Sequence, residues 1–121
     1  MLFRSVQYDL DVLIYATGFQ WMATSTFNMI TGRGGQTLSD KWKSSGTRTF
    51  LGLHSNGFPN LLIVTGPQGG GGSFNFTDAI EAHVDYIVWL LGLMRDRGVE
   101  VVDVTEDAEI RYAEQIGRAH V

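Results

Sequence analysis

The sequence predicts an α/β fold in a single domain, and three observations support this. Two short apolar runs, Asp11–Ala16 and Leu61–Thr65, have the composition of strands that are covered on both faces of a sheet. Each run ends in a glycine turn. A longer stretch, from about Asn75 to Arg97, repeats apolar residues with the period of an amphipathic helix. Strands that alternate with helices are typical of α/β proteins, and a chain of 121 residues suits one domain.

The elements of the first half are short. A strand over Val12–Ala16 is expected to end at the small-residue turn Thr17-Gly18-Phe19. The segment Leu38–Trp42 suits one or two turns of amphipathic helix, and Thr47–Leu53 has the composition of a short strand. Dense turn residues follow at Ser55–Asn60.

The second half contains the one long helix. It follows the strand over Leu61–Thr65 and a glycine-rich loop, with Asn75 or Thr77 as its N-cap and Gly98 after its last turn. Arg95 and Arg97 complement the negative end of its dipole. The residues predicted on its buried side are Ala79, Ile80, His83, Val84, Ile87, Leu91 and Met94. A third strand is expected over Val99–Val104, and Thr105 is expected to begin a further helix.

Composition excludes several classes of protein. Nine basic and 13 acidic residues give a net charge of −4, and the basic residues are scattered, whereas a nucleic-acid surface needs a concentrated basic patch. Without cysteine the chain has no disulfides and no thiolate metal sites. The longest apolar run, Tyr86–Met94, is about half of a membrane span. We therefore expect a soluble, cytoplasmic protein that contacts neither nucleic acid nor membrane.

Two strand–turn segments are candidates for ligand contact. In Asp11–Phe19 the glycine at position 18 allows backbone to approach a flat or phosphorylated ligand, although a strand that ends in glycine is also ordinary loop chemistry. In Val64–Phe76 a strand, a glycine loop and a helix N-terminus form a site suited to negative charge, such as phosphate or the electron-rich edge of a flavin. The loop matches neither GxGxxG nor a P-loop, so a plain surface linker is the alternative.

The remaining polar and aromatic residues favour structural roles. His83 is expected to be a hydrogen-bonded core or boundary histidine, and His54 lies in a turn without a second ligand at metal spacing, so no metal site is expected. Acidic residues are expected on solvated faces and at caps, namely Glu81, Asp85, Asp103, Glu106 and Asp107. The tryptophans Trp21, Trp42 and Trp89 are expected in the core.

Taken together, these residues resemble the C-terminal part of the FAD domain of flavin-dependent Baeyer–Villiger monooxygenases. The pattern covers roughly Tyr8 to Tyr112. Its segments, in order, are Asp11–Phe19 (DVLIYATGF), Gly35, Leu38, Trp42, Arg48–Leu53 (RTFLGL), Gly57–Leu61 (GFPNL), Gly66-Pro67, Asn75 and Ile80-Glu81. The Ala-Thr-Gly turn is shared with flavin-containing and N-hydroxylating monooxygenases. The combination of RTFLGL and GFPN points more narrowly to the Baeyer–Villiger group. Departures from the family are Gln20 for an acidic residue, Gly69–Gly72 for a loop richer in Ser and Pro, and Tyr112 for Trp.

The resemblance implies part of a three-layer, Rossmann-like dinucleotide-binding FAD domain, with one long helix in its second half. It implies FAD and NADPH as cofactors of a longer parent protein, O₂ and a small-molecule ketone as its substrates, and an ester or lactone as product. The implied cofactor-binding residues are Ala16, Thr17, Gly18, Phe19, Gly66, Pro67, Asn75, Phe76 and Thr77. The implied substrate-loop residues are Gly69, Gly70, Gly71, Gly72, Ser73 and Phe74. The chain itself contains neither GxGxxG nor the family fingerprint FxGxxxHxxxW, so no catalytic residue is assigned, and the isolated chain is expected to be inactive.

Two other functions stay open at this point. A flavin monooxygenase that oxygenates nitrogen or sulfur would share the Ala-Thr-Gly turn. A small non-catalytic nucleotide-binding module would need only the glycine loop. The upstream sequence discriminates among the three, because only the monooxygenases carry two GxGxxG motifs.

The two ends match the translation of a sequencing adapter. Met1–Ser5 (MLFRS) corresponds to one orientation, and Gln115–Val121 (QIGRAHV) corresponds to the other. We therefore expect residues 1–5 and 115–121 to be adapter-derived and to make no core contacts. Residues 6–114 are then expected to be the C-terminal fragment of an FAD-binding domain.

Overall fold

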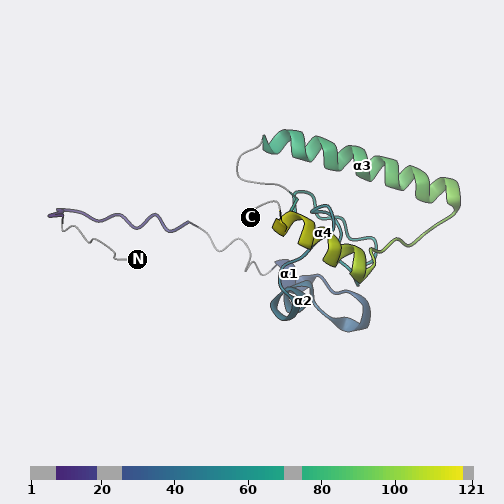
Figure 1. The fold of residues 1–121 in the computed structure, drawn as a ribbon, viewed down its shortest axis with the longest axis horizontal. Helices are drawn as coiled ribbons and strands as arrows, with labels where there is room; N and C mark the ends of the chain where they lie inside the picture. The colour runs from purple at the N-terminus through teal and green to yellow at the C-terminus, as the bar shows by residue number, and fades with distance from the viewer. Residues whose placement is uncertain (1–7, 19–25, 70–74, 119–121) are drawn as a thin grey trace.

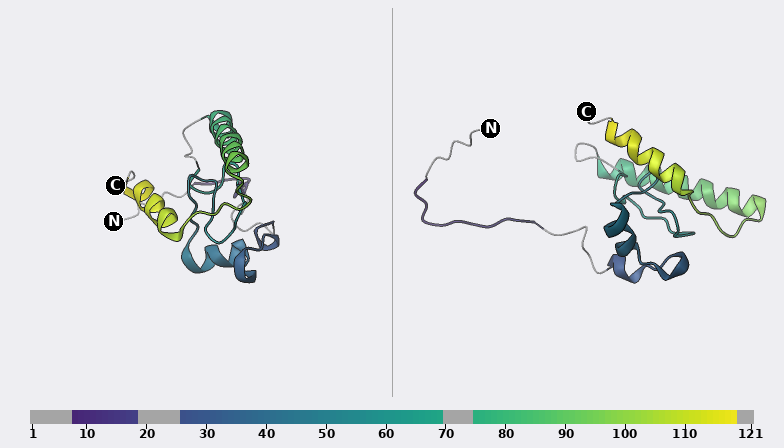
Figure 2. Two further views of the ribbon diagram at one scale, coloured as in Figure 1. Left: turned by 90° about the vertical axis from the view of Figure 1, so that its right-hand side faces the viewer. Right: turned by 60° about the horizontal axis from the view of Figure 1, so that its bottom comes forward.

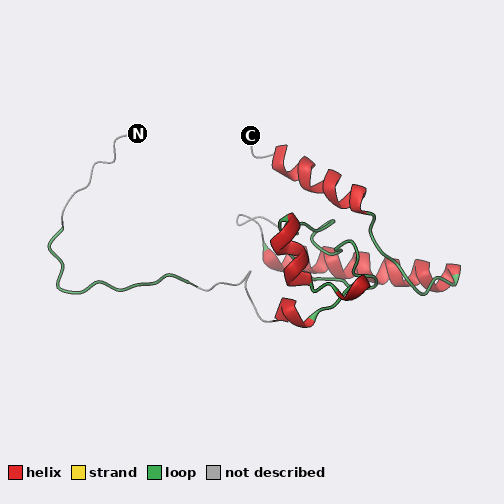
Figure 3. Ribbon diagram, turned by 90° about the horizontal axis from the view of Figure 1, so that it is seen from below, coloured by secondary structure: helices red, strands yellow, loops and turns green. Residues whose placement is uncertain are grey.

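The computed structural model describes residues 8–18, 26–69 and 75–118. Its elements are α1 (Thr26–Met29), the 3₁₀ turn η2 (Arg33–Gly35), α2 (Leu38–Ser45), α3 (Phe76–Arg97) and α4 (Glu106–Arg118). α3 lies on one side of a body of loops, α1 and α2 lie on the opposite side, and α4 runs along the flank between them (Figures 1 and 2). The described residues are helical and contain no strand (Figure 3).

The helices begin where local chemistry places them. Thr37 caps α2, because its side chain accepts a hydrogen bond from the Asp40 amide. Asn75 caps α3 by accepting from the Thr77 amide, and Gly98 ends α3 in the left-handed conformation. Thr105 caps α4 through a hydrogen bond from the Ala108 amide. The predictions of helices over 38–42, over 75–97 and after Thr105 are confirmed.

The predicted strand Asp11–Ala16 is wrong for this chain. Residues 9–18 run out from the body without regular structure (Figure 1). Ile14 is 82 % exposed and Tyr15 is 80 % exposed. A strand forms only when a neighbour satisfies its backbone hydrogen-bonding groups, and none of the described residues pairs with this run.

The predicted strand Leu61–Thr65 is also wrong, as is the strand over Thr47–Leu53. Thr47–Leu53 lies beside residues 61–66, and two backbone hydrogen bonds join them, from the Ile63 amide to the Leu53 carbonyl (2.8 Å) and from the Gly66 amide to the Gly52 carbonyl (3.0 Å). Residues with positive φ interrupt the pairing, namely Leu51 (58°), Gly52 (70°), Thr65 (53°) and Gln68 (64°). A β-ladder needs strongly negative φ, so these turns prevent a continuous strand.

The expected strand over Val99–Val104 is an extended segment that pairs with the side chain of Asn60. The Asn60 amide group donates to the Glu100 carbonyl (2.9 Å), and its oxygen accepts from the Val102 amide (2.9 Å). The Asn60 backbone amide also donates to the Val102 carbonyl (2.9 Å). The Asn56 side chain donates to the Val104 carbonyl (2.7 Å), so isolated contacts, and no ladder, hold this segment. The α/β expectation is therefore not met within the described residues.

The hydrophobic core is small and lies between α2 and the loop that follows Phe58. Leu38, Trp42 and Phe58 form its centre. Four partly buried side chains pack around them, namely Phe27, Ile30, Leu61 and Ile63. The prediction for Trp42 is confirmed, Trp89 is 59 % exposed and was wrongly placed in the core, and Trp21 lies outside the described residues.

The long helix α3 has its buried face rotated from the predicted one. His83 and Leu90 are its buried residues, whereas Val84 and Leu91 are 45 % and 54 % exposed. The helix rests on loops, and the loops contact the side that carries His83, Tyr86 and Leu90. The periodicity was correct, but a helix that is apolar over much of its surface does not by itself show which side is covered.

α4 continues to Arg118, beyond the expected boundary at Glu114. Ile116 is half-buried and falls on the same side of the helix as Glu109 and Tyr112. Residues 1–5 and 119–121 lie outside the described residues. No described helix is long and apolar enough to span a membrane.

Candidate functional site

The structure separates the two groups of predicted site residues. Ala16, Thr17 and Gly18 are exposed on the extended N-terminal segment, away from the body (Figure 1). Gly66 and Pro67 lie in the body, beside Gly52. Asn75, Phe76 and Thr77 are exposed at the start of α3. The other predicted residues, Phe19, Gly70, Gly71, Gly72, Ser73 and Phe74, lie outside the described residues.

The turn from Thr65 to Gly69 is held on one side by Thr49. This threonine is fully buried, and its hydroxyl donates to the Pro67 carbonyl. Its backbone amide donates to the side-chain oxygen of Gln68 (3.0 Å). Two hydrogen bonds from one buried residue therefore fix both the backbone and a side chain of the turn.

Gly52 and Gly69 bring two backbone segments into direct contact. A Cβ at Gly52 would lie 1.9 Å from the Cα of Gly69. A Cβ at Gly69 would lie 2.9 Å from the Gly66 carbonyl oxygen and 3.1 Å from the His83 ring. Glycine is required at both positions, because any side chain would separate the turn from the segment beneath it.

His83 holds the same turn at Thr65. It projects from α3, is 9 % exposed, and its Nδ1 accepts a hydrogen bond from the Thr65 amide (3.0 Å). The prediction of a hydrogen-bonded boundary histidine is confirmed. The sequence did not indicate its partner, because Thr65 is separated from it by the glycine loop.

The start of α3 lies on the chain beyond this turn. The first amides of an α-helix have no carbonyl four residues earlier, and they form a partially positive site. The Asn75 side chain already accepts a hydrogen bond from the Thr77 amide, and Phe76 is 61 % exposed. This end of the helix thus offers backbone donors and an aromatic surface, which suit a flat, electron-rich group.

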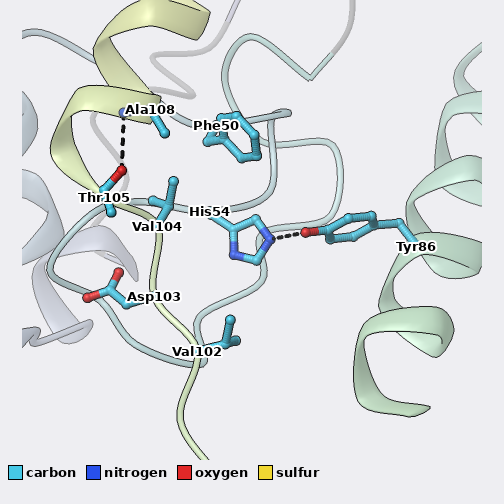
Figure 4. Close-up of a pocket in the computed structure, with 8 residues that line it drawn as sticks. All are labelled: Phe50, His54, Tyr86, Val102, Asp103, Val104, Thr105 and Ala108. Atoms are coloured by element: carbon cyan, nitrogen blue, oxygen red, sulfur yellow. Dashed lines mark hydrogen bonds between the residues drawn. The ribbon is translucent and has the colours of Figure 1, made fainter. Parts of the chain in front are cut away.

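A concavity of about 250 Å³ lies between α3, α4 and the turn at His54 (Figure 4). Its wall is largely apolar, with Phe50, Val102, Val104 and Ala108 around the ring of His54. The His54 Nε2 and the Tyr86 hydroxyl lie 2.9 Å apart. Burial raises the pKa of Tyr86, so its phenol stays protonated and can donate this hydrogen bond.

Lowering the pH is expected to destabilise the chain through His54. Burial lowers the pKa of His54 from 6.5, and the negative charge of Asp103 partly offsets this. The folded chain therefore favours the neutral ring. The contribution of His54 to the free energy of unfolding is therefore fully present above the pKa that His54 has in the unfolded chain. It is lost as the pH falls through the lower pKa of His54 in the folded chain.

The measurement is the free energy of unfolding of the wild type and of His54→Gln, between about pH 7 and about pH 5. The other titrating groups cancel in the difference between the two proteins. The wild type is expected to lose its relative advantage as the pH falls. A difference that stays constant with pH would contradict the assignment.

Sequence reasoning missed the most buried charged cluster. Glu109 is fully buried and lies 2.8 Å from the Lys41 ammonium. It also accepts from the Ser55 hydroxyl (3.3 Å) and the Asn56 amide (3.0 Å). Lys41 further donates to Ser55 and to the Asn56 carbonyl. The cluster joins α2, the Ser55 turn and α4, and no local pattern pointed to it, since Lys41 and Glu109 are 68 residues apart.

The acidic residues expected at the surface behave differently from one another. Asp107 forms an exposed pair with Arg111, as expected. Asp103 is mostly buried, lies 3.7 Å from Arg33, and has one oxygen without a hydrogen-bond partner. Among the described residues, no group of three or more His, Asp or Glu side chains is arranged to hold a metal ion.

Comparison with known proteins gives consistent relatives. The chain is 37 % identical over 105 residues to phenazine N-monooxygenase PhzNO1 of Lysobacter antibioticus, covering 86 % of this chain and 19 % of that protein. It is 38 % identical over 106 residues to a Baeyer–Villiger monooxygenase of Streptomyces coelicolor, covering 85 % of this chain and 17 % of that protein. The chain thus spans about a fifth of the length of these relatives. No protein-family model matches it.

Solved structures agree with the sequence relatives. The OTEMO complex with FAD and NADP matches 95 % of this chain and 21 % of its own, with a TM-score of 0.77 and 32 % identity. Cyclohexanone monooxygenase bound to ε-caprolactone matches 90 % of this chain and 21 % of its own, with a TM-score of 0.70 and 32 % identity. The chain therefore belongs to the Baeyer–Villiger and related flavin monooxygenases, and it corresponds to about a fifth of such a protein.

Proposed function

We propose that the whole protein containing this segment is an FAD- and NADPH-dependent monooxygenase that inserts an oxygen atom beside a ketone carbonyl and yields an ester or lactone. One observation carries the proposal: 95 % of the chain superposes on OTEMO in complex with FAD and NADP, at 32 % identity. The relatives named Baeyer–Villiger monooxygenases, which are 30–41 % identical to this chain, support the same reaction.

FAD would supply the redox chemistry with NADPH and O₂, and this segment would supply contacts around the flavin ring. Gly66, Pro67 and the start of α3, from Asn75 to Thr77, fit that role, because they combine a fixed turn with backbone donors and the exposed Phe76 ring. We assign the substrate-side wall to Gly69–Phe74. These residues bind and orient, and the catalytic residues belong to the rest of the protein.

The N-terminal segment has a separate part in this proposal. We infer that Asp11–Ala16 joins a sheet of the whole protein, so that Ala16–Phe19 lies at the crossing between its two dinucleotide-binding units. Its high exposure in this chain supports the inference, because an apolar run with unpaired backbone groups needs a covering partner. We infer that this sheet, with Asp11–Ala16 in it, forms the middle layer of the three-layer FAD domain in the whole protein.

Oxygenation of nitrogen is the second candidate function. The specific observation is the 37 % identity to phenazine N-monooxygenase PhzNO1, which is similar to the identity with proteins named Baeyer–Villiger monooxygenases.

The test uses the complete reading frame that contains this segment, expressed and purified. The expected result is bound FAD, NADPH consumption stimulated by cyclic ketones, and a product one oxygen atom heavier that behaves as a lactone. An N-oxide from a phenazine, with no lactone from any ketone, would favour the second candidate. A protein without flavin would defeat both.

The isolated 121-residue chain is expected not to bind FAD at micromolar concentration. A helix terminus contributes about 0.3–1 kcal/mol when exposed and up to about 2 kcal/mol when partly buried, whereas micromolar binding requires about 8 kcal/mol. One of the α3 amides is already taken by the Asn75 side chain. The pyrophosphate-binding turn of a dinucleotide domain, GxGxxG, does not occur in this sequence.

The measurement is quenching of FAD fluorescence on titration with the chain, with the complete protein as the positive comparison. Saturable micromolar binding by the soluble, monomeric chain would instead favour a stand-alone nucleotide-binding module.

A further inference from the structure

The turn from Thr65 to Gly69 holds a conformation that its residues do not favour by themselves. Thr65 has φ 53° and Gln68 has φ 64°, in the left-handed region. A residue with a Cβ rarely adopts this region, because its Cβ comes too close to the following carbonyl oxygen, and for the β-branched Thr65 it is a genuine outlier. Contacts outside the turn must therefore maintain it.

Two residues outside the turn supply such contacts. Thr49 donates hydrogen bonds to the Pro67 carbonyl and to the Gln68 side chain. His83 binds at the strained residue itself, because its Nδ1 accepts from the Thr65 amide at 3.0 Å. The His83 ring also closes the space beside Gly69, since a Cβ there would lie 3.1 Å from its Cε1.

The geometry requires a particular form of the His83 ring. Nδ1 accepts a hydrogen bond, so it carries no proton, and the neutral ring has its proton on Nε2. His83 is 9 % exposed and its hydrogen bond to Thr65 is partly buried, so loss of the imidazole would leave the Thr65 amide without its acceptor.

We propose that His83 is a positioning residue that presets the Thr65–Gly69 turn for a bound cofactor. The inference rests on the proposed function, in which Gly66 and Pro67 lie beside the flavin. In this role the Nδ1 atom of His83, on α3, keeps the backbone of the turn in the conformation that receives the flavin ring.

Two substitutions separate this role from general packing. The Asn side-chain oxygen stands the same number of bonds from Cα as His Nδ1, so His83→Asn retains the acceptor. In His83→Gln the acceptor stands one bond further from Cα, so with α3 unchanged it no longer matches the position of Nδ1 opposite the Thr65 amide. Helix propensity predicts the opposite order of stability, because Gln is the better helix former.

The experiment compares the complete holoenzyme with both variants, reading hydrogen exchange over residues 62–69, the Kd for FAD and the visible circular dichroism of the flavin. We expect His83→Gln to speed exchange and weaken FAD binding about tenfold, as the loss of one hydrogen bond to a partly buried amide implies. His83→Asn is expected to stay within about twofold of the wild type. Equal effects of the two variants, or faster exchange with an unchanged Kd and spectrum, would overturn the positioning role.

The two proposals fail in different ways. A wild-type protein that holds no FAD defeats the proposed function. The exchange of residues 62–69 is then still compared in the cofactor-free proteins, and equal exchange in the wild type and His83→Gln would overturn the assignment of His83 on its own.

Discussion

Replacing Glu109 with alanine is expected to lower the free energy of unfolding of the chain by about 3–5 kcal/mol, the cost of leaving one member of a buried ion pair without its partner. Glu109 is fully buried and accepts hydrogen bonds from Lys41, Ser55 and Asn56. Removing the Glu109 carboxylate would leave the Lys41 ammonium, which is itself buried, without an opposite charge. The measurement is urea unfolding followed by circular dichroism.

Arg111→Ala is the matched control on the same helix. It also removes an ion pair, with Asp107, but both side chains of that pair are largely exposed, and such pairs contribute about 0–1 kcal/mol. The double variant Lys41→Met with Glu109→Leu is expected to recover most of the loss, since no charge is left unpaired. If Glu109→Ala costs no more than Arg111→Ala, the cluster does not hold α2, the Ser55 turn and α4 together.

Gly52→Ala is expected to destabilise the chain by about 2–5 kcal/mol. The new Cβ would lie 1.9 Å from the Gly69 Cα and 2.5 Å from its nitrogen, so the two backbone segments must separate, at a cost of about 1–3 kcal/mol. The positive φ of 70° adds about 1–2 kcal/mol for a residue with a Cβ. The same unfolding measurement applies.

Gly34→Ala separates these two causes. Gly34 has φ 70°, as Gly52 has, and a Cβ there would meet no atom within 4 Å. It therefore carries only the backbone cost. Equal losses in the two variants would show that the close contact between Gly52 and Gly69 contributes nothing.

The parts of the fold that could be predicted are those in which the partners are close in sequence. Asn75, Thr105 and Gly98 act on amides or carbonyls within a few residues, so their positions predicted the ends of α3 and the start of α4. The glycine turn at Gly66–Gly69 was likewise visible as turn chemistry.

The errors have one physical cause. Apolar runs such as Asp11–Ala16 show that a segment must be covered, but a strand exists only where another chain segment supplies hydrogen bonds. In this chain the partner of Leu61–Thr65 is a segment with a positive-φ turn, and Val99–Val104 pairs with Asn60 and with the Asn56 side chain. Composition carries no information about either.

The sequence by itself determined the family, through residues that recur in order along almost the whole chain, and the helices, through caps and periodicity. Only the tertiary structure decided which side of α3 is buried, that His83 and Thr49 hold the Thr65–Gly69 turn, and that Lys41 meets Glu109 across 68 residues. Helix signals are local, because each backbone hydrogen bond closes within four residues. Burial and buried polar contacts depend on segments distant in the chain, so they become visible only when the fold brings those segments together.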